Sequence, residues 1–257
     1  MMKSSVMNQL RKGHTFSVSL AFLLALSLTM TSCDKRKNIH QVVKEIAEAP
    51  VDTIGFVERL VHTNPFATVD IDCFADVTYH QTPMGSDHRV VLKALPKVLD
   101  NVEVSVEDGD LVVGVDRRYR MPDKAVAVVD IYAPYVSTFT LDGGKCLRLG
   151  KVAMTSPLEL ILHGNVGAFT ADSLTAHELT IVLEGSGSYD LKNLNTGDLR
   201  AKMTGAGSIT LAGKCRSAYL AVKNGGHIDA TKLVSENEMQ HSVTGRGQVL
   251  MSKATKK

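Results

Sequence analysis

Apolar and polar residues alternate along most of the chain after residue 65, which is the period of a half-buried β-strand. Val69, Ile71 and Cys73, for example, are separated by Asp70 and Asp72. The turn sequence Asp108-Gly109-Asp110 lies between two apolar runs and predicts a β-hairpin. We therefore expect residues 63–138 to form a strand-rich leading segment with antiparallel pairing.

A series of glycines divides the residues that follow into similar units. Its members are Gly143, Gly164, Gly185, Gly205, Gly225 and Gly245, at steps of 21, 21, 20, 20 and 20 residues. A second glycine follows three of them, namely Gly187, Gly207 and Gly247, and alternating apolar runs flank most turns. A unit of roughly 20 residues cannot bury its own apolar face, so such units stack into a solenoid. The prediction is an all-β fold in which residues 139–252 form a β-solenoid, like a parallel β-helix with coils of roughly 20 residues.

The N-terminal segment has the pattern of an export signal. Lys3, Arg11 and Lys12 precede an uncharged apolar run from Phe16 to Met30, which is short for a membrane span of about 20 residues. The run ends in Met30-Thr31-Ser32-Cys33, which resembles the lipobox of bacterial lipoproteins. That resemblance implies that the Cys33 thiol is acylated and that the signal is cut before Cys33, so that residues 1–33 hold the signal peptide and the lipidated cysteine. The alternative is an ordinary secretory signal.

Residues 34–62 are expected to form a tether that is partly helical. Ile39, Val42, Val43 and Ile46 have helical spacing, which Pro50 ends. A second apolar stretch, residues 54–61, either docks on the domain or stays mobile. The domain itself is expected to span residues 63–252.

The net charge of the chain argues against nucleic-acid binding. The whole chain carries a net charge of +2, but without the three basic residues of segment 1–33, 26 basic residues face 27 acidic ones. A nearly neutral mature protein lacks the basic surface of a nucleic-acid-binding protein.

Two turn sequences carry a family resemblance. Gly185-Ser186-Gly187-Ser188-Tyr189 and Gly205-Ala206-Gly207-Ser208-Ile209, with Asp108-Gly109-Asp110-Leu111, resemble the bacterial family called putative auto-transporter adhesin, head GIN domain. The resemblance runs from about Phe66 to Met251. It is weaker at residues 143–145 and 224–227, where the Gly-Ser-Gly turn is lost. It implies an envelope-exposed β-solenoid, often a lipoprotein, with an adhesin role and no catalytic residues.

The residues themselves offer little catalytic chemistry. A glycoside-cleaving site needs carboxylates close together on neighbouring coils, but Asp172, Asp190 and Asp229 lie at different offsets from their turn glycines. Only one coil has an Asp at the phase of calcium-binding repeats, and the histidines and cysteines are scattered; these residues are His163, His177, His227, His241, Cys73, Cys146 and Cys215. We therefore predict no catalytic residues, no cofactor and no metal site. The predicted modification site is Cys33, and the predicted structural positions are the turn glycines.

These patterns favour a non-enzymatic, lipid-anchored envelope protein that acts as a binding, adhesin-like or scaffold module. The alternatives are a carbohydrate-active β-helix enzyme and a regulatory envelope sensor. The expected partners are the membrane, through the lipid anchor, and a glycan or another envelope protein, which the loop around Arg118 could meet if the glycan is anionic. The protein is expected at the outer membrane, facing the periplasm or the cell surface. An open solenoid end is an unpaired edge, which either Lys253, Lys256 and Lys257 or a second copy would close.

Overall fold

The computed structural model describes residues 45–46, 49–116, 118–122, 125–164 and 167–252. These residues belong to one compact unit, Asn38–Lys257. The signal segment with Cys33, residues 34–44 and 47–48 of the predicted tether, and the C-terminal lysines lie outside the described residues. Within the described part, no helix is long and apolar enough to cross a membrane.

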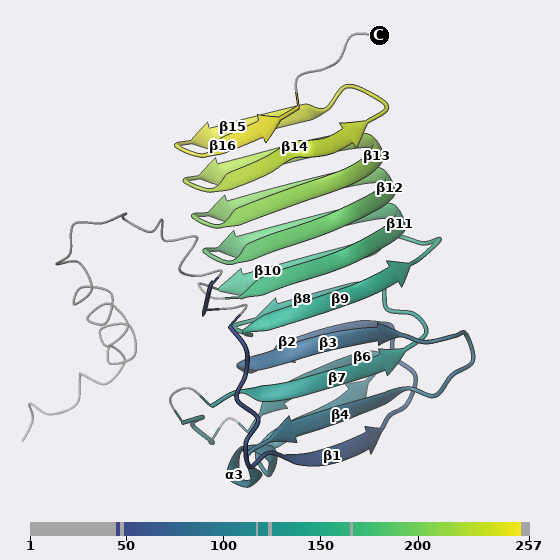
Figure 1. Ribbon diagram of the computed structural model, residues 1–257, viewed down its shortest axis with the longest axis vertical. Coiled ribbons are helices and arrows are strands. Elements are labelled where there is room, and N and C mark those ends of the chain that lie inside the picture. Colours follow the sequence, from purple (N-terminus) through teal and green to yellow (C-terminus); the bar gives the residue numbers. More distant parts are fainter. Residues whose placement is uncertain (1–44, 47–48, 117, 123–124, 165–166, 253–257) are drawn as a thin grey trace, which may run out of the picture. The chain divides into compact units, whose positions relative to one another are not determined.

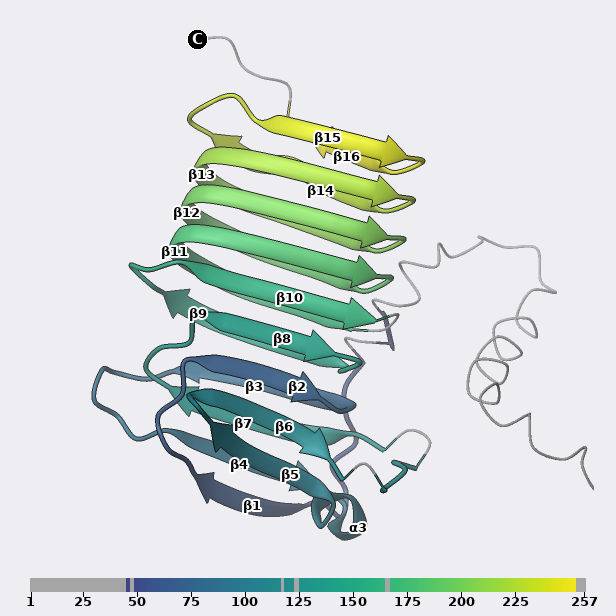
Figure 2. The ribbon, with the colours of Figure 1, turned by 180° about the vertical axis from the view of Figure 1, so that it is seen from behind.

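The strands form one continuous 16-stranded sheet that folds back on itself, so that its two halves face each other and enclose one core (Figures 1 and 2). We call these halves sheet I and sheet II. Sheet I contains, in spatial order, β1 (Val57–His62), β4 (Arg89–Ala94), β7 (Ala127–Ala133), β3 (Ala75–Gln81) and β9 (Cys146–Ala153), and later β14 (His227–Ser235) and β16 (Gln248–Met251). Sheet II contains β5 (Val102–Glu107), β6 (Asp110–Val115), β2 (Thr68–Asp72), β8 (Thr138–Asp142), β10 (Leu158–Gly164) and, at its far end, β15 (Gln240–Gly245).

Three long strands pass from sheet I to sheet II and make the solenoid continuous. They are β11 (Ala168–Gly185), β12 (Ser188–Gly205) and β13 (Ser208–Asn224). In β11, Ala168–Thr175 pairs with β9, whereas Leu179–Gly185 pairs with β10. Both pairings are parallel. The predicted parallel solenoid is therefore confirmed, and it begins earlier than residue 139 because β2 and β3 already form a coil with parallel neighbours.

The core follows from the alternation seen in the sequence. Equivalent inward residues of successive coils lie in columns, so that Leu160, Ile181, Ala201 and Leu220 are in register and fully buried. The rings of Phe169 and Tyr189 stack with centroids 4.9 Å apart and 8° between their planes. Most of the other inward positions are aliphatic. Strands about 4.8 Å apart bring equivalent side chains into direct contact, and aliphatic side chains pack closely at that spacing.

The backbone conformation at the first position of each turn explains why glycine recurs there. Gly185, Gly205, Asn224 and Gly245 lie directly next to one another in successive coils. Their φ angles are 121°, 130°, 81° and 102°, and a Cβ on Gly205 would lie 2.2 Å from the carbonyl oxygen of Gly185. Asn224 fills this position because Asn tolerates the left-handed region better than most residues. Gly225, counted in this series from the sequence, lies in the same turn but one residue later.

The second glycine of each turn makes room for a core side chain. A Cβ on Gly187 would lie 2.4 Å from Cδ2 of Leu162, and one on Gly207 would lie 2.5 Å from Cδ2 of Leu183. Each leucine fills the turn end of the core in the preceding coil. The Gly-x-Gly spacing therefore serves backbone geometry at its first position and packing at its second.

Antiparallel strands and a short helix close the N-terminal end, which we call the capped end. β1 pairs with β4, β4 with β7 and β5 with β6, all antiparallel. Helix α3 (Pro96–Leu99) connects β4 to β5 and buries Val98 and Leu99. The predicted hairpin at Asp108-Gly109 is confirmed, with φ of 52° and 89°. Residues 57–62, placed in the tether from the sequence, form the edge strand β1.

Candidate functional site

The outer face of sheet I carries a row of histidine, arginine and tyrosine side chains at the capped end, three of which stack on one another. We call this row, which comprises His62, Arg89, Tyr132 and His80, the stacking ladder. The four residues are cross-strand neighbours on β1, β4, β7 and β3. They point outward because the alternate positions, such as Val90 and Ile131, are buried.

The contacts within the stacking ladder are close. The rings of His80 and Tyr132 stack with centroids 4.5 Å apart and 13° between their planes. The guanidinium carbon of Arg89 lies 4.2 Å from the centroid of the Tyr132 ring. Such stacking holds long side chains in fixed positions and keeps a cation at the surface.

Ion pairs between residues of the next two columns of the sheet support the stacking ladder. The carboxylate of Asp130 lies 3.0 Å from Nε2 of His80 and 3.4 Å from Nζ of Lys93. Lys93 also lies 3.7 Å from Glu58. The side chains of His80 and Lys93 are 40% and 38% exposed, so these pairs order the surface more than they stabilise the fold.

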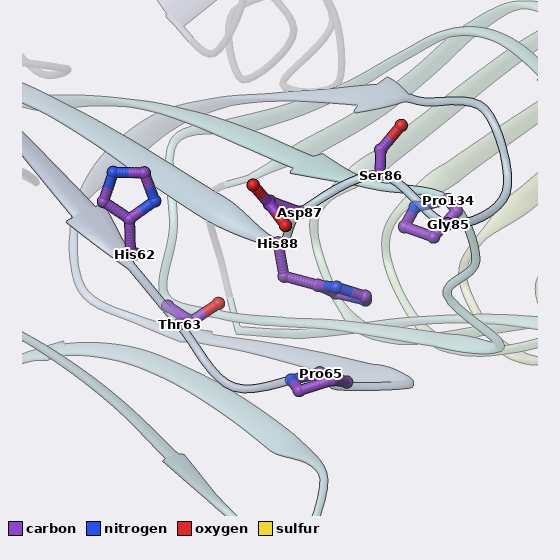
Figure 3. A pocket seen from close by; sticks show the side chains of 8 residues that line it. All are labelled: His62, Thr63, Pro65, Gly85, Ser86, Asp87, His88 and Pro134. Carbon is purple, nitrogen blue, oxygen red and sulfur yellow. The ribbon is translucent and has the colours of Figure 1, made fainter.

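A hollow of about 560 Å³ lies beside His62, where β1 ends and the loop between β3 and β4 returns. We call it the cap hollow. Its lining residues are His62, Thr63, Pro65, Gly85, Ser86, Asp87, His88 and Pro134. Figure 3 shows His62 and Thr63 at the left, Asp87 and the His88 ring near the centre, Pro65 below them and Pro134 at the right.

The second histidine of the cap hollow is fixed by the core. The His88 ring makes an edge contact with Phe66, with centroids 4.9 Å apart, and the main-chain N–H of Thr63 donates to the carbonyl oxygen of His88 at 3.2 Å. The hydroxyl oxygen of Thr63 is buried and has no hydrogen-bond partner among the described residues. A buried polar atom without a partner is uncommon.

The cap hollow therefore combines the apolar rings of two prolines with hydroxyl, imidazole and carboxylate groups. Such a lining suits a molecule that has both apolar faces and several hydroxyl groups, since rings contact the faces while polar groups fix the orientation. The described residues contain no group of three or more His, Cys, Asp or Glu side chains that could hold a metal ion.

A different set of charges lies on the outer face of sheet II. Asp142, His163 and Glu184 form a column on β8, β10 and β11, with Nδ1 of His163 3.2 Å from Glu184. Nearby, burial and the charges of Asp72 and Asp142 raise the pKa of Asp70. The histidine and glutamate side chains are 39% and 59% exposed, so water screens this column.

The acids weighed from the sequence are arranged differently than expected. Asp190, Thr210 and Asp229 share one outward column of sheet I, whereas the offsets from the turn glycines had separated Asp190 from Asp229. That separation was wrong, because Asn224 and not Gly225 is the equivalent of Gly205. A threonine nevertheless lies between the two acids, and Asp172 is exposed at a strand bend outside this column.

Comparison with known proteins settles the family. Residues 65–256 match the family described as "Putative auto-transporter adhesin, head GIN domain". The chain belongs to this family. No protein of curated function matches the GIN-domain chain.

Solved structures share the GIN-domain fold. A putative adhesin from Parabacteroides distasonis has a TM-score of 0.66 at 15% identity and covers 76% of this chain and 81% of its own. A putative lipid binding protein from the same species has a TM-score of 0.64 at 14% identity, with 77% and 97% covered. A putative adhesin from Bacteroides fragilis has a TM-score of 0.60 at 18% identity, with 77% and 96% covered. At these identities the likeness concerns the fold alone.

The remaining predicted positions of the GIN domain are structural. The turn glycines Gly143, Gly164, Gly185, Gly187, Gly205, Gly207, Gly225, Gly245 and Gly247 lie at or between strand ends. Cys73, Cys146 and Cys215 are all buried, and burial raises the pKa of Cys73 to about 12. Arg118 pairs with Asp116 at 2.9 Å in an exposed loop.

Sequence reasoning missed the stacking ladder and the cap hollow. Each strand that contributes was visible as an alternating run, so the outward position of Arg89 and Tyr132 could have been inferred. The pairing of β4 with β1 and β7 could not, because these strands are far apart in the chain and carry no repeat.

Proposed function

We propose that this GIN-domain protein is a non-enzymatic envelope lipoprotein that binds a glycan at its capped end. The observation that carries the proposal is the cap hollow beside the stacking ladder, where His62 belongs to both. A sugar ring has apolar C–H faces and many hydroxyl groups. The rings of the hollow match the former, and Ser86 and Asp87 match the latter.

The envelope location rests on the export signal and on the family. A positive start, an apolar run and a lipobox-like Cys33 favour a lipid anchor. The description of the family as adhesins favours a protein associated with the envelope or exposed outside the cell. Replacing Cys33 with Ala removes the thiol that would carry the acyl chains, so the variant should no longer incorporate a labelled fatty acid, whereas the wild type should. Protease treatment of intact cells then shows whether the domain faces outward.

A glycan array tests the binding site. The full-length protein, extracted in detergent, should bind a restricted set of neutral or acidic oligosaccharides. The double variant His62→Ala/Asp87→Ala should lose at least about tenfold in affinity, since two of the polar groups are removed. The matched control is His177→Ala/Asp172→Ala, because these two residues are also exposed and lie elsewhere on the solenoid. A wild-type protein that binds no glycan, or two double variants that bind equally, would contradict the proposal.

A carbohydrate-active enzyme is the second candidate, favoured by the column Asp142–His163–Glu184. Two carboxylates on either side of a histidine are groups that can transfer protons. Their exposure on an outer face favours a solvated surface instead. Release of reducing ends from a glycan that the array identifies, abolished in Glu184→Gln, would establish the enzyme and displace the non-enzymatic proposal.

A further inference from the structure

The two ends of the solenoid are finished in different ways. At the capped end, helix α3 buries Val98 and Leu99, and the edge strands β1 and β5 carry charged residues, such as Glu58 and Glu103. Charges on edge strands prevent pairing with other chains. This end is therefore built to remain solvated.

The last coil, which we call the open end, lacks these features in the described part of the chain. There, β15 pairs with β13 and β16 pairs with β14, each on one side only. The sequences QHSVTG and QVLM of these strands contain no Asp, Glu, Lys or Arg. Two uncharged strand edges therefore lie side by side, one from each sheet, as Figures 1 and 2 show at the C-terminal end.

The core also continues to this end without a cover among the described residues. Val243 occupies the inward position that Val222 occupies one coil earlier, yet it is 41% exposed whereas Val222 is 3% exposed. Met239, Val249 and Met251 pack against the core and are only partly buried. Solenoids need a polar terminal coil to stay soluble alone, and this coil is apolar inside and uncharged at its edges.

We propose that a second copy of the chain covers the open end, so that two solenoids join end to end about a two-fold axis. A head-to-tail arrangement is excluded because the capped end presents a helix and charged edges. A symmetric contact between two open ends remains. With the axis perpendicular to the sheets, each β15 pairs antiparallel with its copy and each β16 does the same. Both sheets and the core then run on into the second copy.

Charge at the rim of the open end supports this geometry. Arg246 is exposed in the turn at one end of β15, and Glu236 and Glu238 are exposed in the loop at its other end. Antiparallel pairing of two β15 strands brings the turn of each copy next to the loop of the other. Arg246 of one chain then faces the acids of its partner on both sides of the axis, which favours this register over a head-to-tail one.

The test is the mass of the full-length protein in detergent, measured by light scattering combined with absorbance and refractive index. We expect two chains for the wild type and one for Val243→Lys, because a buried lysine at the axis cannot find a partner. Leu60→Lys is the matched control, since Leu60 is 50% exposed on β1 at the capped end, and it should stay dimeric. A dimer that survives Val243→Lys would come from shared micelles and would overturn the proposal, as would a monomeric wild type.

A charge exchange tests the geometry separately from the folding of the last coil. Arg246→Glu should weaken the dimer at least fivefold, and Arg246→Glu/Glu236→Lys/Glu238→Lys should restore it. Failure of the triple variant to restore the dimer would contradict the antiparallel arrangement. A wild-type monomer that dimerises only after removal of residues 253–257 would assign the open end to the chain's own tail instead.

Discussion

At the scale of single residues, the glycines of one turn have unequal importance. A Cβ on Gly207 would lie 2.5 Å from Leu183 and 2.6 Å from the carbonyl oxygen of Gly187, whereas one on Gly225 would meet nothing within 4 Å. We expect Gly207→Ala to lower the free energy of unfolding by about 1–3 kcal/mol through overpacking. Gly225→Ala should change it by less than about 0.5 kcal/mol. Urea denaturation followed by circular dichroism compares them, and equal midpoints would contradict this assignment.

The fold places the carboxylate of Asp70 in surroundings that disfavour its ionised form. One of its carboxylate oxygens is buried without a hydrogen-bond partner in the described part, and burial followed by the charges of Asp72 and Asp142 raises its pKa. Because the pKa of Asp70 is raised in the folded protein, ionisation of its carboxyl group destabilises the fold. This destabilisation is complete at pH values above the folded-state pKa and is absent below the ordinary value of about 4. Asp70→Asn should therefore stabilise the protein at pH 7 and have little effect at pH 3.5. Denaturation at both pH values measures this, with the exposed Asp172→Asn as control.

At the scale of elements, the buried Lys145, which forms an ion pair with Asp76 of β3, ties the chain before β1 to the start of β9. Nζ of Lys145 donates to the carbonyl oxygen of Ala49 at 2.7 Å and to Asp76 at 3.1 Å. Its side chain is 6% exposed, and burial lowers its pKa. The pair therefore anchors the segment that leads to the solenoid.

Lys145→Met should release this segment. We expect faster hydrogen exchange in residues 49–56, unchanged exchange in β11–β13, and a loss of about 1–3 kcal/mol because Asp76 loses a buried partner. Lys151→Met on β9, the strand that begins next to Lys145, is the control, since Lys151 is exposed. Unchanged exchange at residues 49–56 in the Lys145 variant would show that other contacts hold the segment.

Elements also show what the sequence could and could not reveal. The coils were predictable because each repeats the same alternation and the same turn, so that one unit implies its neighbours. The role of Asn224 could not be predicted. This asparagine occupies the left-handed position that glycine occupies in the neighbouring coils, so the glycine seen in the sequence, Gly225, lies one residue later. The capped end was less predictable still, since β1, β4 and β7 pair across long stretches of chain. The candidate site depends on those pairings, and for that reason it emerged only from the structure.

At the scale of the whole molecule, the two proposals give the two ends of the solenoid different functions: glycan binding at the capped end and contact between copies at the open end. The cap hollow lies beside β1 and β4, and the proposed contact between copies lies at β15 and β16 (Figure 1). Joining two open ends places the two glycan sites at the opposite tips of the dimer. Such a dimer can hold two glycan chains at once without any new contact in either site.

This arrangement predicts that loss of the dimer weakens binding to a surface with many glycans but leaves the affinity of each single site unchanged. On a surface densely coated with the bound glycan, Val243→Lys should dissociate at least about tenfold faster than the wild type, because the second site no longer adds effective concentration. For the same oligosaccharide free in solution, both proteins should bind equally, since the cap hollow is intact in each. Surface plasmon resonance and calorimetry make the two measurements, with Asp172→Asn, an exposed position on β11 away from both ends, as the dimeric control. Equal dissociation from the dense surface would show that the two sites of the dimer act independently, and a weaker affinity in solution would show that the open end contributes to the glycan site itself.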